Sequence, residues 1–420
     1  MFFNILILVL IKIMDLMKSI MKGKEERKKL YKFKVFKYEE LEPDEDMTKW
    51  PFPRSGHRVV ADTCHLYSFG GYNPKIQGNQ SVEEFSVSTF PLFQELWKFN
   101  IAKKEWVPFE KSRSFPKELA SNAIIRHGDY LLVYGGTGTP FGQRCSNQLY
   151  IISLNDIKSK MCEILTTGQV PLPQYGQALV CNDNYLYTIG GTNGFTYTCD
   201  VHRLDMKTNV WENVYICQGR NDSEPLGRYR HEVAFNGRYI FILGGGTAEM
   251  AFDFKRVPAF DIKQKTWDIV KSKPDPKFLD VGGGIPAPRR CHGLVQLKID
   301  GSLNVFISGG YDGEDVFYDL WRLNLDTFQW SLIPSCVLPY PTYFHSSAVT
   351  PEGKLYNFGG IYINGDLKRH NLVHSTWLCI PKLSEMCWEA LLFYKPDIAD
   401  CDRLTLLNQG YPRSFLKRLD

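Results

Sequence analysis

The hexapeptide LYSFGG at Leu66–Gly71 decides the fold of this chain, because five variants of it recur further along. Each copy is a short apolar run that ends in two adjacent glycines. Successive glycine pairs lie 65, 55, 54, 65 and 50 residues apart, and such a period is typical of repeat architectures. The later copies are LLVYGG at Leu131–Gly136, LYTIGG at Leu186–Gly191, FILGGG at Phe241–Gly246, VFISGG at Val305–Gly310 and LYNFGG at Leu355–Gly360.

Each repeat holds three further strand-like segments. One precedes the glycine pair, and two follow it, the last of which carries a tryptophan at Trp106, Trp211, Trp267 or Trp330. In the second repeat Cys162 stands where the tryptophan is expected, so we expect a looser contact there. One such sheet cannot bury both faces alone, so six four-stranded sheets packed face to face in a ring are predicted.

The doubled glycine, the Tyr or Thr that often follows it and the spaced tryptophan resemble the kelch repeat family from about Arg54 to Pro381. The resemblance implies an all-β, six-bladed kelch β-propeller, to which we assign residues 30–381. Histidine opens the first strand in four repeats. Because buried polar groups need partners, we interpret most of these histidines as scaffold. They are His57, His231, His292 and His345.

The sixth repeat lacks a fourth strand, so the ring must be closed from elsewhere. Residues 31–38 (YKFKVFKY) alternate apolar and lysine side chains, as a strand with one buried face does. We predict that they supply the outer strand of blade six; a basic linker is the alternative. Residues 1–29 are predicted to be a flexible tail, because the apolar run at Phe2–Leu10 is too short to span a bilayer. A weak membrane-surface anchor is the alternative for this tail.

After Pro381 the apolar spacing becomes helical. Leu383, Cys387, Ala390, Leu391 and Tyr394 share one face of a predicted helix that ends before Pro396. Shorter helices are predicted at 403–408 and around 415–419. Packing of these helices against the propeller wall is the simplest interpretation.

Residues 382–420 also resemble the segment that ties cullin-RING substrate receptors to their ligase. Leu383, Cys387 and Leu391 have the spacing of an elongin-binding box, although Lys382 stands where Ser, Thr or Pro often precedes the leucine. Downstream, the three positions that resemble the core of a cullin-2 box are Tyr411, Pro412 and Phe415. The resemblance implies elongin B/C and cullin-2 as partners. An exposed stripe of Leu383 and Cys387 would favour this interpretation, and their burial against the propeller would weaken it.

Loops that enter each first strand, and loops after each glycine pair, should meet at one mouth of the propeller. They bring arginine, tyrosine and small hydroxyl side chains together, a mixture suited to binding a peptide carboxylate. Protein substrates would then bind through their C-terminal ends, as C-terminal degrons. The alternative for each arginine is a structural bond to a backbone carbonyl. The predicted degron-binding residues are Arg228, Arg230, Arg289 and Arg290, with Tyr175, Tyr311 and Tyr343 as walls.

Composition excludes several classes of function. Fifty basic and 46 acidic residues leave a formal charge of +4, too little for a phosphate-binding domain, so no nucleic-acid partner is expected. The eleven cysteines are odd in number and contain no C-x-x-C pair, which argues against a disulfide framework or a zinc site. We therefore expect a reducing compartment, the cytoplasm or also the nucleus, and neither a metal nor another cofactor.

Catalysis is not expected either. The recurring histidines occur one per repeat instead of clustering as copper ligands would, and motifs for nucleophilic or phosphate chemistry are missing. The resemblance therefore implies a non-catalytic substrate receptor of a cullin-2, elongin B/C ubiquitin ligase. The alternative function is a kelch scaffold that binds cytoskeletal or signalling proteins without a ligase.

Overall fold

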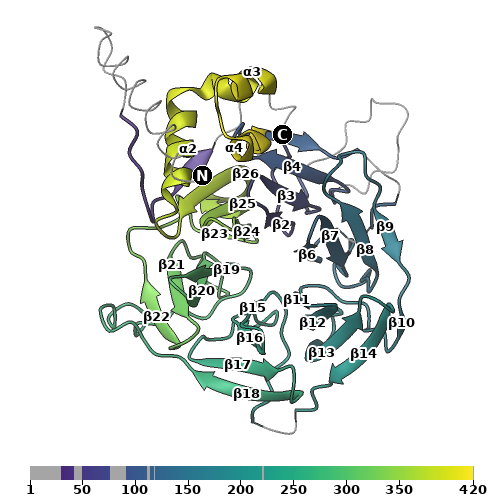
Figure 1. The fold of residues 1–420 in the computed structure, drawn as a ribbon. Coiled ribbons are helices and arrows are strands. Elements are labelled where there is room, and N and C mark those ends of the chain that lie inside the picture. Colours follow the sequence, from purple (N-terminus) through teal and green to yellow (C-terminus); the bar gives the residue numbers. More distant parts are fainter. Residues whose placement is uncertain are drawn as a thin grey trace.

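In the computed structural model, residues 30–41, 50–75, 91–110, 114–117, 119–219 and 222–419 are described. They form six antiparallel sheets, each one blade of a closed ring (Figure 1). The prediction of a six-bladed β-propeller is therefore confirmed. No helix in the described ranges combines the length and the apolar content needed to cross a membrane.

The strands of each blade follow the chain from the channel outward, except for β10 at the edge of blade three and β1 at the edge of blade six. Blade one holds β2 (Arg58–Ala61), β3 (His65–Phe69), β4 (Leu96–Asn100) and β5 (Glu105–Pro108), and blade two holds β6 (Ala123–His127), β7 (Tyr130–Tyr134), β8 (Leu149–Ser153) and β9 (Cys162–Ile164). Blade three holds β11 (Ala178–Asn182), β12 (Tyr185–Thr192), β13 (Tyr197–Asp205) and β14 (Val210–Tyr215), with β10 (Thr167–Gly168) added in parallel at its edge. Blade four holds β15 (Glu232–Phe235), β16 (Tyr239–Leu243), β17 (Arg256–Asp261) and β18 (Thr266–Lys271), and blade five holds β19 (Gly293–Ile299), β20 (Ser302–Ser308), β21 (Leu320–Asn324) and β22 (Gln329–Leu332). Blade six holds β23 (Thr342–Tyr343), β24 (Ser346–Val349), β25 (Lys354–Asn364), β26 (Asp366–Trp377) and β1 (Glu39–Leu41).

In blades four, five and six, the glycine pair makes room for a buried histidine on each side, whereas in blade two Asn122 stands at the histidine position. A Cβ at Gly359 would lie 2.6 Å from Cε1 of His57 in blade one, and a Cβ at Gly360 would lie 2.8 Å from Cβ of His345 in its own blade. Both glycines have positive φ, +58° and +112°, which other residues rarely adopt. The repeat therefore joins neighbouring blades through a wedge of glycine and imidazole. In blade three, Gln177 replaces the histidine.

Because these histidines are buried, we expect the stability of the fold to fall strongly in acid. Burial, with nearby Arg228 for His231 and nearby His374 for His345, lowers the pKa of each to about 3. Below about pH 6.5 the unfolded chain binds protons that the folded histidines do not, so stability falls as the pH falls toward 3. Each histidine should lower the free energy of unfolding by about 2 kcal/mol between pH 7 and pH 5.

Urea unfolding at the two pH values checks this prediction. His345→Gln offers a matched control, because Gln177 occupies the same place in blade three and does not titrate. In that variant, the difference in the free energy of unfolding between pH 7 and pH 5 should be smaller by one histidine's contribution, about 2 kcal/mol. An unchanged difference between pH 7 and pH 5 would contradict the assignment.

Tryptophans fill the space between blades, as the repeats predict. Trp211 of blade three lies 5.4 Å from Tyr134 of blade two between ring centroids, and pairs with Leu204 in its own blade. In blade two the prediction for Cys162 needs correction. Cys162 is exposed and pairs with Ile151, so the preceding residue, Met161, takes the position of the tryptophan and is fully buried. Because Met161 belongs to the apolar cluster shared with blade one, this contact is filled.

The N-terminal segment closes the ring, but the strand starts later than predicted. β1 pairs antiparallel with β26, from Glu39 opposite Ser375 to Leu41 opposite Val373. In residues 31–38, Val35 makes one parallel bridge to Trp377, and the segment otherwise runs as irregular chain. The hydrogen bond between Glu40 and His374 (2.7 Å) lies in the paired stretch. The predicted tail, residues 1–29, lies outside the described residues.

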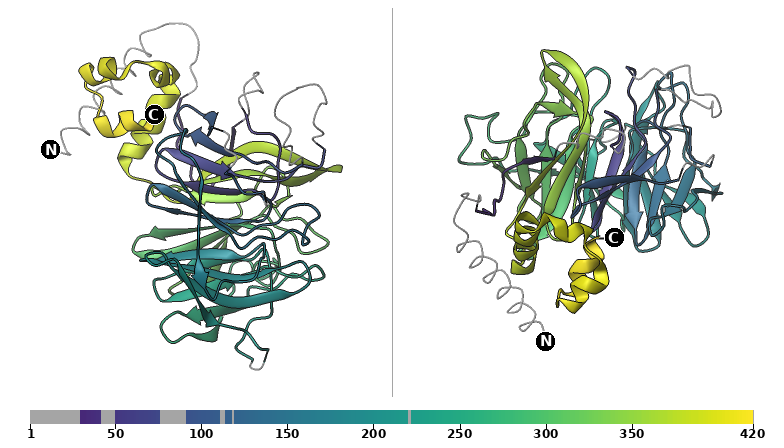
Figure 2. Two further views of the ribbon diagram at one scale, coloured as in Figure 1. Left: turned by 90° about the vertical axis from the view of Figure 1, so that its right-hand side faces the viewer. Right: turned by 90° about the horizontal axis from the view of Figure 1, so that it is seen from above.

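Helices follow the last blade, as predicted. They are α2 (Leu383–Tyr394), η2 (Pro396–Asp400), α3 (Arg403–Asn408), α4 (Arg413–Leu416) and η3 (Lys417–Leu419). We call residues 382–419 the tail. It lies against the hairpin turns of blades six and one, on what we call the lower face. Figure 2 shows that the tip of the β25–β26 hairpin points to the opposite side, the upper face.

Candidate functional site

The upper mouth of the central channel is a closed ring of backbone hydrogen bonds. One residue per blade, just before the first strand, donates its N–H to the carbonyl of its counterpart in the preceding blade, over 2.8–3.2 Å. All six residues have positive φ. They are Gly56, Ser121, Gly176, Arg230, Cys291 and Phe344. This ring positions the side chains that face the mouth.

Arg230 crosses the ring. Its guanidinium donates to the hydroxyl of Ser121 in blade two and lies 4.7 Å from the ring centroid of Phe344 in blade six. A side chain at Gly56 would meet it, because a Cβ there would lie 3.1 Å from Nη2. Arg230 is 5% exposed, its Nε has no partner, and no described carboxylate forms an ion pair with it. Burial and then the charge of Arg58 lower its pKa to about 10, so it remains cationic at neutral pH.

Arg58 closes the channel below this level. It pairs at 2.6 Å with Glu232 of blade four, across the channel from its own blade one. Arg230 therefore lies between this ion pair and the upper mouth of the channel. A buried cation without a counter-ion is costly, and an incoming anion would relieve that cost.

Arg290 lies at the mouth with two tyrosines. It donates to backbone carbonyls in the blade-four loop, those of Thr247, Ala248 and Met250, and lies 5.4 Å from the ring centroid of Tyr311. Tyr311 stacks on Tyr343 at 5.1 Å. None of these described contacts is with a carboxylate. The two tyrosines thus lie together at the mouth.

Tyr175 lies on the blade-three side of the mouth. Its ring packs edge-on against that of Tyr229, with 6.0 Å between the centroids. Burial raises the pKa of the Tyr175 hydroxyl above its usual value, and the charge of nearby Arg230 offsets part of this rise. Five of the seven predicted residues thus gather at the mouth. They are Arg230, Arg290, Tyr175, Tyr311 and Tyr343.

The other two predicted residues, Arg228 and Arg289, belong to the scaffold. Each donates Nη1 to the carbonyl of the first glycine in its blade's pair, Gly244 or Gly309, at 3.0 Å. Each also donates Nε to the carbonyl two residues before it and stacks on a phenylalanine. Arg54 makes the same contacts in blade one. We therefore correct the prediction that Arg228 and Arg289 contact a ligand carboxylate.

Arg369 is an arginine at the mouth that the sequence pattern did not predict. It projects from β26, donates at 2.8 Å to the hydroxyl of Ser55 and lies 5.3 Å from the ring centroid of Tyr72. Blade six replaces the loop after its glycine pair with a long hairpin, which carries Arg369 to the mouth. Its signal was present in the sequence, because strand-like residues continue on both sides of Gly365.

The tail brings some of its predicted residues together and separates others. Leu383 is 47% exposed, whereas Cys387 is 5% exposed and Leu391 is buried, so they do not form one exposed stripe. Tyr411, Pro412 and Phe415 are partly buried. Phe415 stacks on Trp388 at 5.2 Å with an interplanar angle of 6°.

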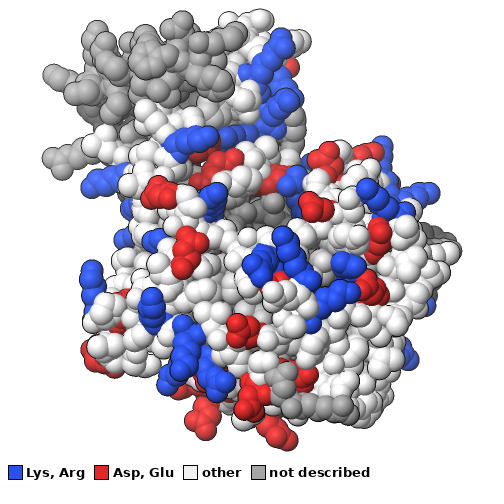
Figure 3. All heavy atoms as spheres, turned by 60° about the horizontal axis from the view of Figure 1, so that its bottom comes forward, with Lys and Arg blue, Asp and Glu red and all other residues white. Residues whose placement is uncertain are grey.

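The electrostatic character of the surface agrees with the small net charge. Figure 3 shows Lys and Arg interspersed with Asp and Glu over the side it displays. A single-sign field of the kind that attracts nucleic acid does not cover that side.

Comparison with known proteins gives consistent matches over the propeller. A family model described as the KLHDC2/KLHL20/DRC7 Kelch-repeats domain matches residues 20–245, 87–298 and 220–392. The chain is 42% identical over 382 residues to the Kelch domain-containing protein 10 homolog of Drosophila melanogaster, covering 88% of this chain and 62% of that protein. It therefore spans less than two thirds of that relative. It is 40% identical over 370 residues to Kelch domain-containing protein 10 of Homo sapiens, covering 88% and 80%.

A more distant relative shares the same kind of repeat. Host cell factor 1 of Homo sapiens is 27% identical over 358 residues, which cover 81% of this chain and 14% of that protein. Kelch propellers are protein-interaction domains, and this propeller is one. From its six glycine-pair repeats, its six blades and these matches, we conclude that the chain belongs to the kelch-repeat family.

Proposed function

We propose that this chain is the substrate-recognition subunit of a cullin-2, elongin B/C ubiquitin ligase, and that its upper face binds the C-terminal ends of target proteins. The observation that carries the proposal is Arg230, a buried guanidinium at the upper mouth of the channel without a described carboxylate partner. A terminal carboxylate would supply that partner through charge-assisted hydrogen bonds. The chain itself would be a non-catalytic adaptor.

Aromatic walls support the same ligand. Tyr311, Tyr343 and Tyr175 surround the arginines with rings that exclude water and strengthen a charge pair. Arg369 is half-buried and bound to one hydroxyl, so it can turn toward a ligand at small cost. The Arg58–Glu232 ion pair spans the channel below Arg230, which favours a ligand that ends at the mouth over a continuous chain that passes through.

The ligase half of the proposal rests on the tail. The tail lies on the lower face, on the side opposite the tip of the β25–β26 hairpin, so a substrate and a ligase arm could be held at the same time (Figure 2). Leu383, at the start of α2, is 47% exposed, which leaves part of its side chain free to enter a partner's pocket.

A kelch scaffold without a ligase is the second candidate, and one observation favours it. Cys387 and Leu391 are already buried, and Phe415 is stacked on Trp388 within the tail. On this alternative, the tail packs only for stability.

Co-purification with elongin B/C separates the two candidates. We expect a stoichiometric complex with the wild type and at least about tenfold weaker binding for Leu383→Glu, because the change would place a charge in an apolar pocket. Leu404→Glu is the matched control, since Leu404 is a 69% exposed leucine on α3 outside the box. Equal loss in both variants, or wild-type protein that binds no elongin, would contradict the ligase assignment.

A further inference from the structure

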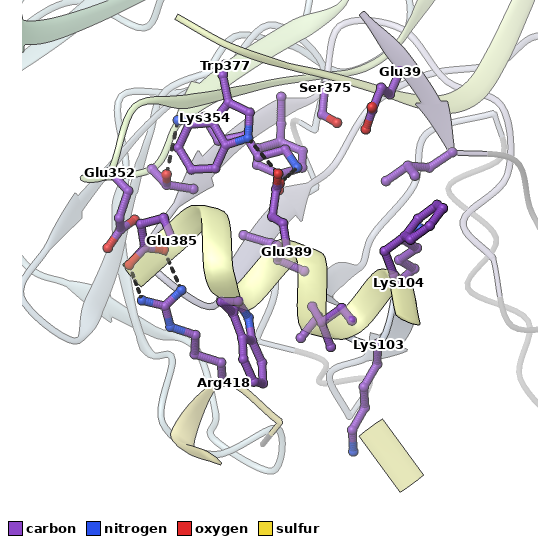
Figure 4. A pocket seen from close by; sticks show the side chains of 18 of the residues that line it. Glu39, Lys103, Lys104, Glu352, Lys354, Ser375, Trp377, Glu385, Glu389 and Arg418 are labelled. Carbon is purple, nitrogen blue, oxygen red and sulfur yellow. Dashed lines mark hydrogen bonds and ion pairs between the residues drawn. The ribbon is translucent and has the colours of Figure 1, made fainter. Parts of the chain in front are cut away.

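The contact between the tail and the propeller is polar and centres on one carboxylate. Glu389 of α2 accepts hydrogen bonds from Lys354 at the start of β25, from Trp377 Nε1 at the end of β26 (3.0 Å) and from the hydroxyl of Tyr31 (2.9 Å). A pocket lies between α2 and the neighbouring ends of β25 and β26. Figure 4 shows Lys354 and Trp377 both directed at Glu389 across this pocket. Three donors from two separate parts of the chain thus converge on one side chain.

The apolar core of the tail is its own. Its buried members are Trp388, Leu391, Ile398, Leu406, Leu416 and Leu419. Of the described propeller residues, Ala102 packs against this cluster. Because apolar contacts are mostly internal to the tail, they hold it together and do little to orient it on the propeller.

A second ion pair stiffens the tail itself. Arg418 makes a bidentate pair with Glu385 at 2.6 and 2.8 Å, and Asn100 donates to the Arg418 carbonyl at 3.2 Å. Figure 4 shows this pair on the other side of α2 from Lys354. The pair therefore fixes the end of the tail against α2, and the Asn100 hydrogen bond adds a polar contact with the propeller.

The segment that closes the ring takes part in the same junction. The Tyr31 backbone N–H donates at 2.9 Å to the Tyr394 hydroxyl, and its ring lies 5.6 Å from that of Phe393. Tyr31 precedes β1 by a few residues, so the chain that completes blade six also holds α2. Closure of the propeller and placement of the tail are thereby connected.

We propose that Glu389 is a positioning residue: with Lys354, Trp377 and Tyr31 it forms a polar clamp that sets the orientation of the tail relative to the substrate-binding face. The consequence for ubiquitin transfer rests on the proposed function. A substrate held on the upper face reaches the ligase arm at a rate set by their mutual geometry, so a loose junction lowers the effective concentration of the reacting groups.

The first experiment measures orientation and does not depend on any partner. Cys162 on blade two and Cys401 in the tail are exposed, whereas the other nine cysteines are buried or partly buried, so spin labels can be attached to this native pair. We expect a narrow distance distribution in the wild type and at least a doubling of its width in Glu389→Ala. Glu352→Ala is the matched control, because Glu352 lines the same pocket and forms no described ion pair. A Glu389→Ala distribution as narrow as that of the wild type would overturn the clamp.

A conservative variant separates positioning from simple loss of folding. Glu389→Gln keeps an oxygen that accepts from Trp377 and Tyr31 but loses the charge that pairs with Lys354, so its width should lie between those of the wild type and Glu389→Ala. Hydrogen exchange of α2 should change little in either variant, because its core is internal. Exchange of the whole tail at the rate of an unfolded chain in Glu389→Ala would also overturn the proposal.

The second experiment tests the consequence for transfer. In a reconstituted ligase, Glu389→Ala should leave peptide affinity and elongin affinity within twofold of the wild type and lower the maximal rate of ubiquitin transfer several-fold. An unchanged maximal rate would overturn the positioning role. If the wild type binds no elongin, the proposed function fails, while the distance measurement still decides whether the clamp exists.

Discussion

Peptides with a free C-terminal carboxylate should bind the wild type about 100-fold or more tightly than the same peptides with an amidated end. Removing one partner of a buried charge pair costs roughly 2–5 kcal/mol. Amidation removes the carboxylate that would pair with Arg230, which has no described carboxylate partner in the free protein. The measurement is titration of the protein with a pool of decapeptides that end in glycine, prepared in both forms. Equal affinity of the two forms would refute carboxylate recognition.

Arg230→Met provides the complementary test. It keeps the length of the side chain and removes the charge, so it should lose the preference for a free carboxylate. It should also raise the melting temperature, because a desolvated cation without a described counter-ion is replaced by an apolar group. Arg144→Met is the control for nonspecific loss of positive charge, since Arg144 is exposed on the blade-two loop of the same face. A binding loss as large in Arg144→Met as in Arg230→Met would contradict the assignment.

Arg289→Ala should destabilise the fold by about 3 kcal/mol or more, because truncating one partner of a buried ion pair leaves the other partner and its acceptors unsatisfied. Arg289 is fully buried, pairs with Asp319 at 2.5 Å and donates to the carbonyls of Gly309 and Ala287. Urea unfolding measures the change.

The neighbouring residue makes a matched control. Arg290→Ala loses bonds to loop carbonyls alone and should cost about 1 kcal/mol. Its effect should appear in the affinity for carboxylate peptides instead. If Arg290→Ala proved the more destabilising of the two, the division between scaffold and mouth residues would be wrong.

Repeats made the fold predictable. Six glycine pairs at similar spacing require six similar units, and only glycine tolerates both the positive φ and the close approach of a neighbouring imidazole. The helices of the tail were predictable for a similar reason, since the period of the apolar side chains changes after Pro381. A local sequence pattern is sufficient to predict structure where the constraint on the chain is itself local.

Registers at the irregular blades were harder to predict. The outer strand of blade six lies at Glu39–Leu41 and not within residues 31–38, because the alternation of lysine and apolar side chains does not tell which of its residues meet β26. In blade two a shift of one residue puts Met161 in place of Cys162. A shift by one residue exchanges the two faces of a strand, so small errors change which side chain is buried.

By itself the sequence determined the number of blades, the scaffold role of most of the recurring histidines and a set of arginines and tyrosines near one mouth. Only the tertiary structure separated Arg230 and Arg290 from the structural Arg228 and Arg289, added Arg369, and joined Glu389 to Tyr31 and Lys354. The physical reason is that composition and period are local properties of the chain. Which donors a guanidinium or carboxylate meets depends on residues from other blades and from the opposite end of the chain, brought together only when the ring closes.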